Sequence, residues 1–128
     1  MVLKPNPVNW FEIPVSDLSR ATEFYQHIFD VELPLHEMGG VKMAWFPMVP
    51  MSQNEPGAAG SLIKGGDSRP SQSGTCVYFS VEDIEDVLRK VNAKGGKTVA
   101  PKGSIGEYGF IALFTDTEGN KVGLHSLK

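Results

Sequence analysis

The sequence predicts an α+β protein built from two related halves, each with the order strand, helix and then three strands. Two short segments with one plan open the halves, Trp10–Leu18 and Cys76–Ile84, and they are offset by 66 residues. Each segment is an apolar strand that ends in Val-x-Asp followed by Leu or Ile, and each precedes apolar residues at helical spacing. An internal repeat of this kind indicates a duplicated supersecondary unit.

The two helices are predicted from their caps and their periodicity. Asp17 and Asp83 stand where a helix would begin, and a carboxylate there accepts hydrogen bonds from free N–H groups of the first turn. The pair Gly95-Gly96 supplies a stop for the second helix. The apolar positions of the two helices are Leu18, Ala21, Phe24, Tyr25 and Ile28, and then Ile84, Val87, Leu88 and Val91.

The remaining strands are separated by residues that favour turns and loops. Turns are expected at Gly39-Gly40 and at residues 117–120, and loops at residues 50–57 and 65–74. The strands are expected at residues 32–37, 42–48 and 60–64, and at 98–102, 108–115 and 121–126. Because a unit of about 60 residues buries little core alone, the modules, about 5–65 and 74–128, should pack as one domain over 1–128.

Composition and charge exclude some classes of binding partner. The net charge is −3 and acids and bases are interspersed, so neither nucleic acid nor a membrane is expected as a partner. A single cysteine, Cys76, excludes an intrachain disulfide and fits a reducing compartment. The first residues lack the apolar core of a signal peptide, and no apolar run approaches the ~20 residues of a membrane span. A cytoplasmic protein is expected.

Strand parity separates two faces, because successive side chains point to opposite sides. The aliphatic sets must cover the helices: Phe11, Ile13 and Val15, then Val77, Phe79 and Val81, and finally Val122 and Leu124. The opposite face then carries Trp10, Glu12, Cys76, Tyr78, Gly123 and His125. Two aromatics with a carboxylate, a thiol and an imidazole can line a pocket for an organic ligand.

Two segments carry a family resemblance. Residues 11–25, FEIPVSDLSRATEFY, and residues 114–124, FTDTEGNKVGL, resemble the opening and the terminal hairpin of vicinal-oxygen-chelate proteins. These include glyoxalase I (lactoylglutathione lyase), whose subgroup the chain resembles, extradiol dioxygenases, and fosfomycin and bleomycin resistance proteins. The resemblance implies paired βαβββ modules that form a cup-shaped mixed sheet, with helices on its outer face, and a homodimer.

The resemblance also implies positions for metal ligands. In metal-dependent members these positions fall on Trp10 in the first strand, on Cys76 in its repeat, on Gly123 in the last strand and near residues 61–63. Divalent metals in the family take imidazole and carboxylate donors, which Trp and Gly do not offer. The resemblance therefore predicts a degenerate site and no metal cofactor.

The leading functional hypothesis is a protein that binds a small organic ligand in its cup without a metal; whether it is an enzyme stays open. As a lyase-like enzyme acting next to a carbonyl, it would use Glu12 and His125 in catalysis. Trp10, Cys76 and Tyr78 would contact the ligand. The simpler alternatives are Glu12 paired with a nearby cation, an exposed His125, a small apolar role for Cys76 and plain packing for the two aromatics.

Two further hypotheses stay open. One is a non-catalytic protein that sequesters a drug or metabolite, as bleomycin resistance proteins do. The other is a metal-dependent lyase or dioxygenase with relocated ligands, for which Glu12 and His125 are the evident donors.

Overall fold

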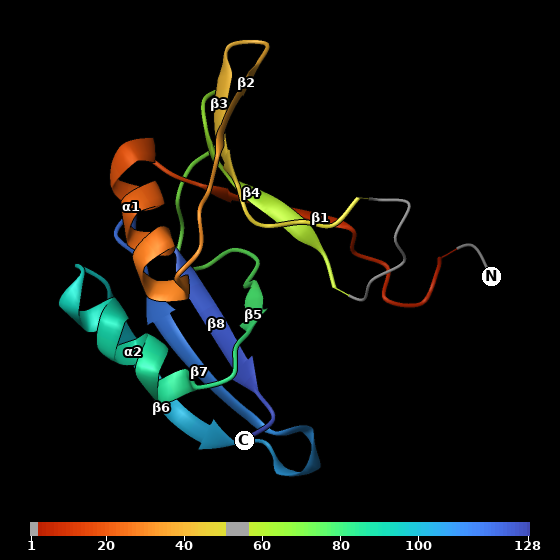
Figure 1. The fold of residues 1–128 in the computed structure, drawn as a ribbon, viewed down its shortest axis with the longest axis vertical. Coiled ribbons are helices and arrows are strands. Elements are labelled where there is room, and N and C mark those ends of the chain that lie inside the picture. Colours follow the sequence, from red (N-terminus) through yellow and green to blue (C-terminus); the bar gives the residue numbers. More distant parts are fainter. Residues whose placement is uncertain (1–2, 51–56) are drawn as a thin grey trace.

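The computed structural model describes residues 3–50 and 57–128 and confirms an α+β fold with the predicted order of elements (Figure 1). The first half contains β1 (Trp10–Pro14), α1 (Leu18–Phe29), β2 (Leu35–Met38), β3 (Val41–Trp45) and β4 (Ala59–Lys64). The second contains β5 (Tyr78–Ser80), α2 (Ile84–Ala93), β6 (Lys97–Ser104), a short 3₁₀ helix (Gly106–Tyr108), β7 (Phe110–Thr115) and β8 (Lys121–Ser126).

Each half forms its own four-stranded mixed sheet, and the two sheets share one topology. The strand orders are β1-β4-β3-β2 and β5-β8-β7-β6. In both sheets the first strand pairs in parallel with the last, and the other pairs are antiparallel. The register places Glu12 opposite Ser61 in the first sheet and Tyr78 opposite Gly123 in the second. Because Glu12 and Tyr78 are equivalent in the repeat, Ser61 and Gly123 are equivalent too.

The predicted helix caps are confirmed. The carboxylate of Asp17 accepts a hydrogen bond from the Arg20 N–H at 3.0 Å, and that of Asp83 accepts one from the Asp86 N–H at 3.1 Å. The first helix ends at Asp30, which takes a left-handed conformation with φ of 52°. After the second helix, Gly95 has φ of 98° and allows the Gly96 N–H to reach the Val91 carbonyl.

Strand limits differ from the prediction where local hydrogen bonds compete with the sheet. Residues 32–34 lie outside β2, because the Leu33 N–H donates to the Gln26 side chain at 2.9 Å and Pro34 has no N–H. The start of β7 is delayed to Phe110 by the 3₁₀ turn. The segment 65–74 has no helix or strand, as predicted, and the expected loop 50–57 lies mostly outside the described residues.

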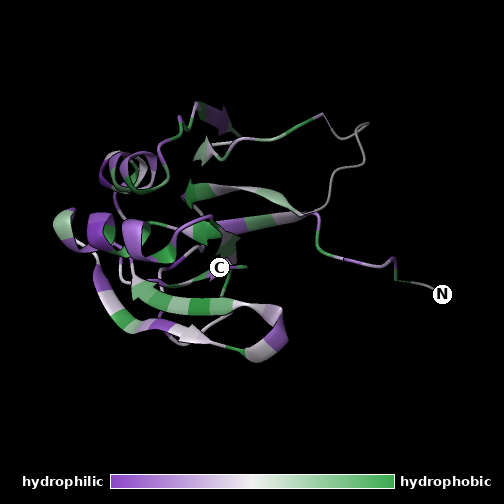
Figure 2. Ribbon diagram, turned by 60° about the horizontal axis from the view of Figure 1, so that its bottom comes forward, coloured by the Kyte–Doolittle hydropathy of each residue, from purple (hydrophilic) through white to green (hydrophobic). Residues whose placement is uncertain are grey.

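The helix-facing side chains form one core that both halves share. Helix α1 packs on β3 and β4, α2 packs on β6, β7 and β8, and the helices lie side by side (Figure 1). Both helices carry hydrophilic and hydrophobic residues (Figure 2), and their buried residues are apolar, as in amphipathic helices. The predicted parity is confirmed: Ile13, Val15, Val122 and Leu124 are at most 4% exposed, while Glu12 is exposed.

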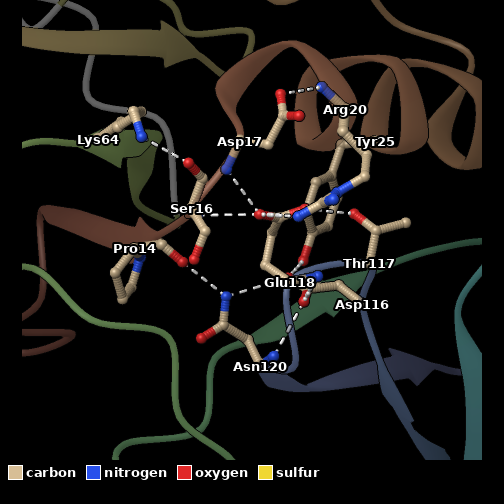
Figure 3. A network of polar contacts seen from close by, with 10 residues as sticks. All are labelled: Pro14, Ser16, Asp17, Arg20, Tyr25, Lys64, Asp116, Thr117, Glu118 and Asn120. Atoms are coloured by element: carbon tan, nitrogen blue, oxygen red, sulfur yellow. Dashed lines mark hydrogen bonds and ion pairs between the residues drawn. The ribbon is translucent and has the colours of Figure 1, made fainter.

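A polar network joins the turn between β7 and β8 to the start of α1 (Figure 3). The Glu118 side chain is fully buried, and its carboxylate accepts hydrogen bonds from the N–H groups of Ser16 at 2.9 Å and Asp17 at 2.8 Å. It also pairs with the Arg20 guanidinium at 2.7 Å. Burial alone would raise the pKa of Glu118, but the bonds from Arg20, the Asp17 N–H, Thr117 and the Ser16 N–H outweigh it and lower the pKa to about 2.

A second part of the network centres on Asp116, which is 4% exposed. Its carboxylate accepts a hydrogen bond from the Tyr25 hydroxyl at 2.6 Å and further bonds from the N–H groups of Glu118 and Asn120. The Asn120 side chain donates to the Pro14 carbonyl at 2.7 Å. Burial, followed by the charge of Asp116, raises the pKa of Tyr25 well above its usual value. The terminal hairpin is therefore the joint between the halves, a role beyond the predicted turn.

Candidate ligand-binding cleft

A cleft of about 1240 Å³ lies between β1 and β5, which we call the β1–β5 cleft. It is lined by both strands, the end of α1 and the start of α2. Each of these strands is the edge of its sheet. The Val15 N–H donates to Ile63 and the Val81 N–H to His125, so alternate backbone groups on β1 and β5 point away from the sheets. Pro14, which has no N–H, fits such an edge.

Four of the five predicted site residues line this cleft: Trp10, Glu12, Cys76 and Tyr78. Glu12 is exposed, and its carboxylate accepts a hydrogen bond from the Trp10 indole at 3.4 Å. Cys76 is a free thiol of intermediate burial, and Tyr78 is 48% exposed. These four side chains could therefore meet one ligand.

His125 does not line the cleft. It lies on β8, paired with Ser80 and Ile111, and its Nε2 is 2.6 Å from the Tyr108 carbonyl. Because a carbonyl only accepts, this contact assigns the ring proton to Nε2 and holds the imidazole against the 3₁₀ turn. The structure therefore does not bring His125 together with Glu12 in the cleft.

Next to the cleft, the open face of the first sheet carries an aromatic cluster. The rings of Trp10 and Trp45 meet edge to face at a centroid distance of 5.6 Å, and His36 stacks on Trp45 at 3.7 Å. Ser61, which is fully buried, lies opposite both Glu12 and Trp45. The Ser61 hydroxyl and the Trp45 indole N–H are buried and have no hydrogen-bond partner among the described residues.

Ser61, Trp45 and His36 were not among the predicted site residues. Parity alone places each of them on one face of its own strand. They become neighbours through the register of β1, β2, β3 and β4, which the alternation of side chains along a single strand does not determine. A signal was nevertheless present, because the implied metal positions included the segment 61–63.

The residues at the implied metal positions do not fit a metal ion. A Cβ atom added at Gly123 would lie 2.4 Å from the Tyr78 ring, so no side chain enters there unless Tyr78 moves. Trp10 and Cys76 occupy two other positions, and Ser61 is the small residue equivalent to Gly123. Within residues 3–50 and 57–128, no three His, Cys, Asp or Glu side chains gather closely enough to hold a metal ion.

Four phenylalanine rings lie between the two halves and also line the cleft. Phe79 of β5 lies 4.8 Å from Phe29, 5.1 Å from Phe46 and 5.5 Å from Phe11, measured between ring centroids. Phe46 is buried at 6% exposure, while Phe11, Phe29 and Phe79 are only partly buried. The cleft therefore has an aromatic floor at the junction of the halves.

Comparison with known proteins identifies the family. Residues 8–124 match the model of the Glyoxalase/Bleomycin resistance protein/Dioxygenase superfamily. The chain belongs to this superfamily. The predicted resemblance to this superfamily is thus confirmed.

Similar proteins and structures agree with this assignment. "Putative glyoxylase CFP32" from Mycobacterium bovis and from Mycobacterium tuberculosis is 29% identical over 120 residues, which are 91% of this chain and 44% of the relative. The chain therefore spans less than half the length of these curated relatives.

No helix in the described ranges, 3–50 and 57–128, is long and apolar enough to cross a membrane.

Solved structures support the fold. A superfamily domain from Frankia sp. has a TM-score of 0.67 at 21% identity, covering 94% of this chain and 97% of that one. A glyoxalase I mutant from Zea mays has a TM-score of 0.67 at 19% identity, covering 94% and 46%. Fosfomycin resistance protein FosX from Listeria monocytogenes has a TM-score of 0.64 at 19% identity, covering 93% and 88%.

Proposed function

We propose that this protein binds a small organic ligand in the β1–β5 cleft and does so without a metal ion. The observation that carries the proposal is that Trp10, Glu12, Cys76 and Tyr78 line one cleft of about 1240 Å³ at the junction of the modules. A concave, largely apolar site with a few polar groups is the usual setting for an organic ligand.

The metal-free part of the proposal is supported by the donor set. Trp10 and Gly123 offer no ligand atom for a divalent metal, and the Tyr78 ring occupies the space that a side chain at Gly123 would need. A metal-dependent lyase or dioxygenase would need ligands at other positions. The donors available for such a site would be Glu12 and His125, and His125 is engaged with the Tyr108 carbonyl.

The chemistry of the bound ligand is assigned to Glu12. Its carboxylate lies in the cleft and is exposed, so it could take a proton from a carbon next to a ligand carbonyl, which would be a lyase-like step. Without that step the protein would hold its ligand unchanged, as a sequestering protein does. His125 lies outside the cleft lining, so the proposed lyase-like step depends on Glu12 without His125.

The proposal also includes the oligomeric state. A homodimer is proposed because the open faces of both sheets carry apolar side chains, with Trp45 and Ile63 partly exposed on the first and Leu113 on the second. The lactoylglutathione-lyase-related subgroup, the single domain and a cytoplasmic location stay predictions. Light scattering at micromolar concentration tests the dimer, which a monomeric mass would contradict.

A thermal-shift screen of small organic compounds in buffer with EDTA tests the proposed function. Compounds that stabilise the wild type should lose their effect in Tyr78→Ala and keep it in Tyr108→Ala, because Tyr78 lines the cleft and Tyr108 does not. Stabilisation that requires a metal, or that survives Tyr78→Ala, would contradict the proposal. For each compound found, the variant Glu12→Gln separates turnover from binding. If the variant still binds the compound but no longer turns it over, Glu12 is the catalytic base. If the wild-type protein releases the compound unchanged, the protein sequesters its ligand.

A further inference from the structure

The open face of the first sheet buries two polar groups without partners. The Ser61 side chain on β4 is fully buried, the indole N–H of Trp45 on β3 is buried too, and neither has a hydrogen-bond partner among the described residues. Ser61 and Trp45 lie directly opposite each other in the antiparallel β3–β4 pair, so their side chains are neighbours on one face. Because buried polar groups in folded proteins are nearly always paired, these two indicate an acceptor that binds there.

Aromatic rings from the neighbouring strands cover these groups. Strand β4 lies between β1 and β3, and two strands that flank a third are about 10 Å apart. The rings of Trp10 on β1 and Trp45 on β3 nevertheless approach to 5.6 Å between centroids, so they lean toward each other above β4. Beneath them β4 presents the small side chains of Ala59 and Ser61, which pair with Trp10 and Trp45. The two rings therefore form a roof over Ser61.

Trp10 is the less firmly held ring of this roof. Trp45 is stacked on His36 of β2 at 3.7 Å. Trp10, in contrast, is the first residue of β1, is partly exposed, and donates its indole N–H to the exposed Glu12 at 3.4 Å, which is long for a hydrogen bond. Trp10 also lines the β1–β5 cleft, whereas Ser61 and Trp45 do not. A ligand in the cleft that displaces the Trp10 ring would therefore reach both unpaired groups.

The two groups define the kind of atom that they bind. An indole N–H only donates and a serine hydroxyl can donate, so one oxygen with two lone pairs can accept from both. Glu12 lies opposite Ser61 on the same face, and its carboxylate would repel an anionic acceptor. A neutral carbonyl oxygen meets both conditions. It is also the group that the proposed proton transfer to Glu12 requires in the ligand.

We propose that the ligand of the β1–β5 cleft carries a neutral carbonyl oxygen, and that Ser61 and Trp45 bind this oxygen behind Trp10. The inference rests on the proposed binding function. The apolar body of the ligand would lie in the cleft beside the displaced Trp10 ring, and its oxygen would accept hydrogen bonds from the Ser61 hydroxyl and the Trp45 indole. Trp10 is then a gate, and Ser61 and Trp45 select ligands that have a carbonyl group.

Two probes of the same shape, acetophenone and α-methylstyrene, test this inference because a carbonyl oxygen in one replaces a methylene group in the other. The chain's two tryptophans are Trp10 and Trp45, so nitrogen-15 NMR of the labelled protein shows two indole N–H signals, and both report on the roof. The variant Trp10→Phe assigns them. Titration with acetophenone should move the Trp45 indole proton downfield, as a new hydrogen bond does, and α-methylstyrene should not.

Matched serine variants assign the selectivity to Ser61. Ser61→Ala should weaken acetophenone binding about fivefold and change α-methylstyrene binding by less than about twofold. Ser80→Ala, at an exposed serine of the cleft, should change acetophenone binding by less than about twofold. Without a probe, Ser61→Ala should unfold at the wild-type temperature or above, which excludes a folding defect. Equal effects of Ser61→Ala on both probes, or an unmoved Trp45 signal, would overturn the inference and favour a buried water as the partner.

The variant Tyr78→Ala separates failure of this inference from failure of the proposed function. It should weaken both probes, because their rings would lie in the cleft that Tyr78 lines. Weakening by Tyr78→Ala without selective weakening of acetophenone by Ser61→Ala overturns the carbonyl and leaves a ligand-binding cleft. No binding of either probe to the wild type overturns the inference, and if the compound screen also finds no ligand sensitive to Tyr78→Ala, the proposed function fails with it.

Discussion

The two halves of the molecule share their architecture and differ in what they place on it. Strand order, helix caps and the aliphatic residues under the helices correspond between them. At the equivalent pairs on the open faces, however, the first half has Glu12 opposite Ser61 and the second has Tyr78 opposite Gly123. Residues that build the fold are thus alike, while residues that could meet a ligand differ, which argues for one asymmetric site and against two copies of a site.

A second difference concerns the last hairpin of each half. In the second half, Asp116, Glu118 and Asn120 of the β7–β8 turn contact the first half through hydrogen bonds (Figure 3). The joint between the halves therefore depends on the β7–β8 turn of the second half and on the start of α1 in the first half. Because β1 and β5 belong to different sheets and do not pair with each other, this polar network and the shared core hold the cleft walls in place.

The largest expected effect comes from breaking this joint at Asp116. Asp116→Ala removes the acceptor of the buried Tyr25 hydroxyl and of two N–H groups, so it should cost about 3–5 kcal/mol of unfolding free energy. Urea denaturation measures the loss. Tyr25→Phe removes one partner only and should cost about 1–2 kcal/mol. Asp67→Ala, at an exposed position, is the control, and a loss in Asp116→Ala no larger than the control's would contradict the joint.

Protonation of Glu118 at low pH should weaken the same joint and lower the free energy of unfolding. The pKa of this carboxyl is lowered from 4.5 to about 2 in the folded protein, so its ionised form stabilises the fold above about pH 5. This contribution, about 3 kcal/mol, should be lost as the pH falls from 5 toward 2. Urea unfolding at several pH values should show a shallower acid slope in Glu118→Gln than in wild type or in the exposed control Glu107→Gln; identical slopes in all three would contradict the assignment.

The pair Tyr78 and Gly123 offers a test of the difference between the open faces. Gly123→Ala would place a Cβ 2.4 Å from the Tyr78 ring, so it should cost about 1–3 kcal/mol in the wild-type background. The same substitution in Tyr78→Ala should cost much less, because the ring is gone. A double-mutant cycle with no coupling between the two positions would show that Tyr78 does not occupy this space.

The equivalent residue in the first half should respond in the opposite direction, and weakly. Ser61→Ala removes a buried hydroxyl that has no hydrogen-bond partner among the described residues, so stability should rise by up to about 1 kcal/mol. Thermal and urea unfolding measure the change. A loss of stability instead would mean that the hydroxyl is hydrogen-bonded in solution.

Much of the fold was predictable because it depends on local chemistry. Asp17 and Asp83 cap their helices through bonds to residues three positions later, and strand parity sorts Ile13 from Glu12 without knowledge of the partner strand. The repeat then supplied the topology. The limits of β2 and β7 were missed where Gln26 and the 3₁₀ turn bind backbone groups that would otherwise extend a strand.

The site was less predictable because its contacts are distant in sequence. Parity placed Trp10, Glu12, Cys76 and Tyr78 on one side, but the relative position of two sheets decides whether they share a cleft. Glu118 meets Arg20 across 98 residues, and His125 is held by the carbonyl of Tyr108 in a turn. Neither contact leaves a periodic pattern in the sequence, so His125 cannot be separated from the other site residues by sequence alone.

The metal content of protein purified without chelators decides whether the β1–β5 cleft binds its ligand without a metal. Mass spectrometry of the metals should be combined with a thermal-shift titration of nickel, zinc, manganese and iron(II). We expect far less than one metal per chain and no stabilisation by any of the four ions. A stoichiometric metal, with stabilisation that disappears in Glu12→Ala, would contradict it and would place a relocated metal site at Glu12.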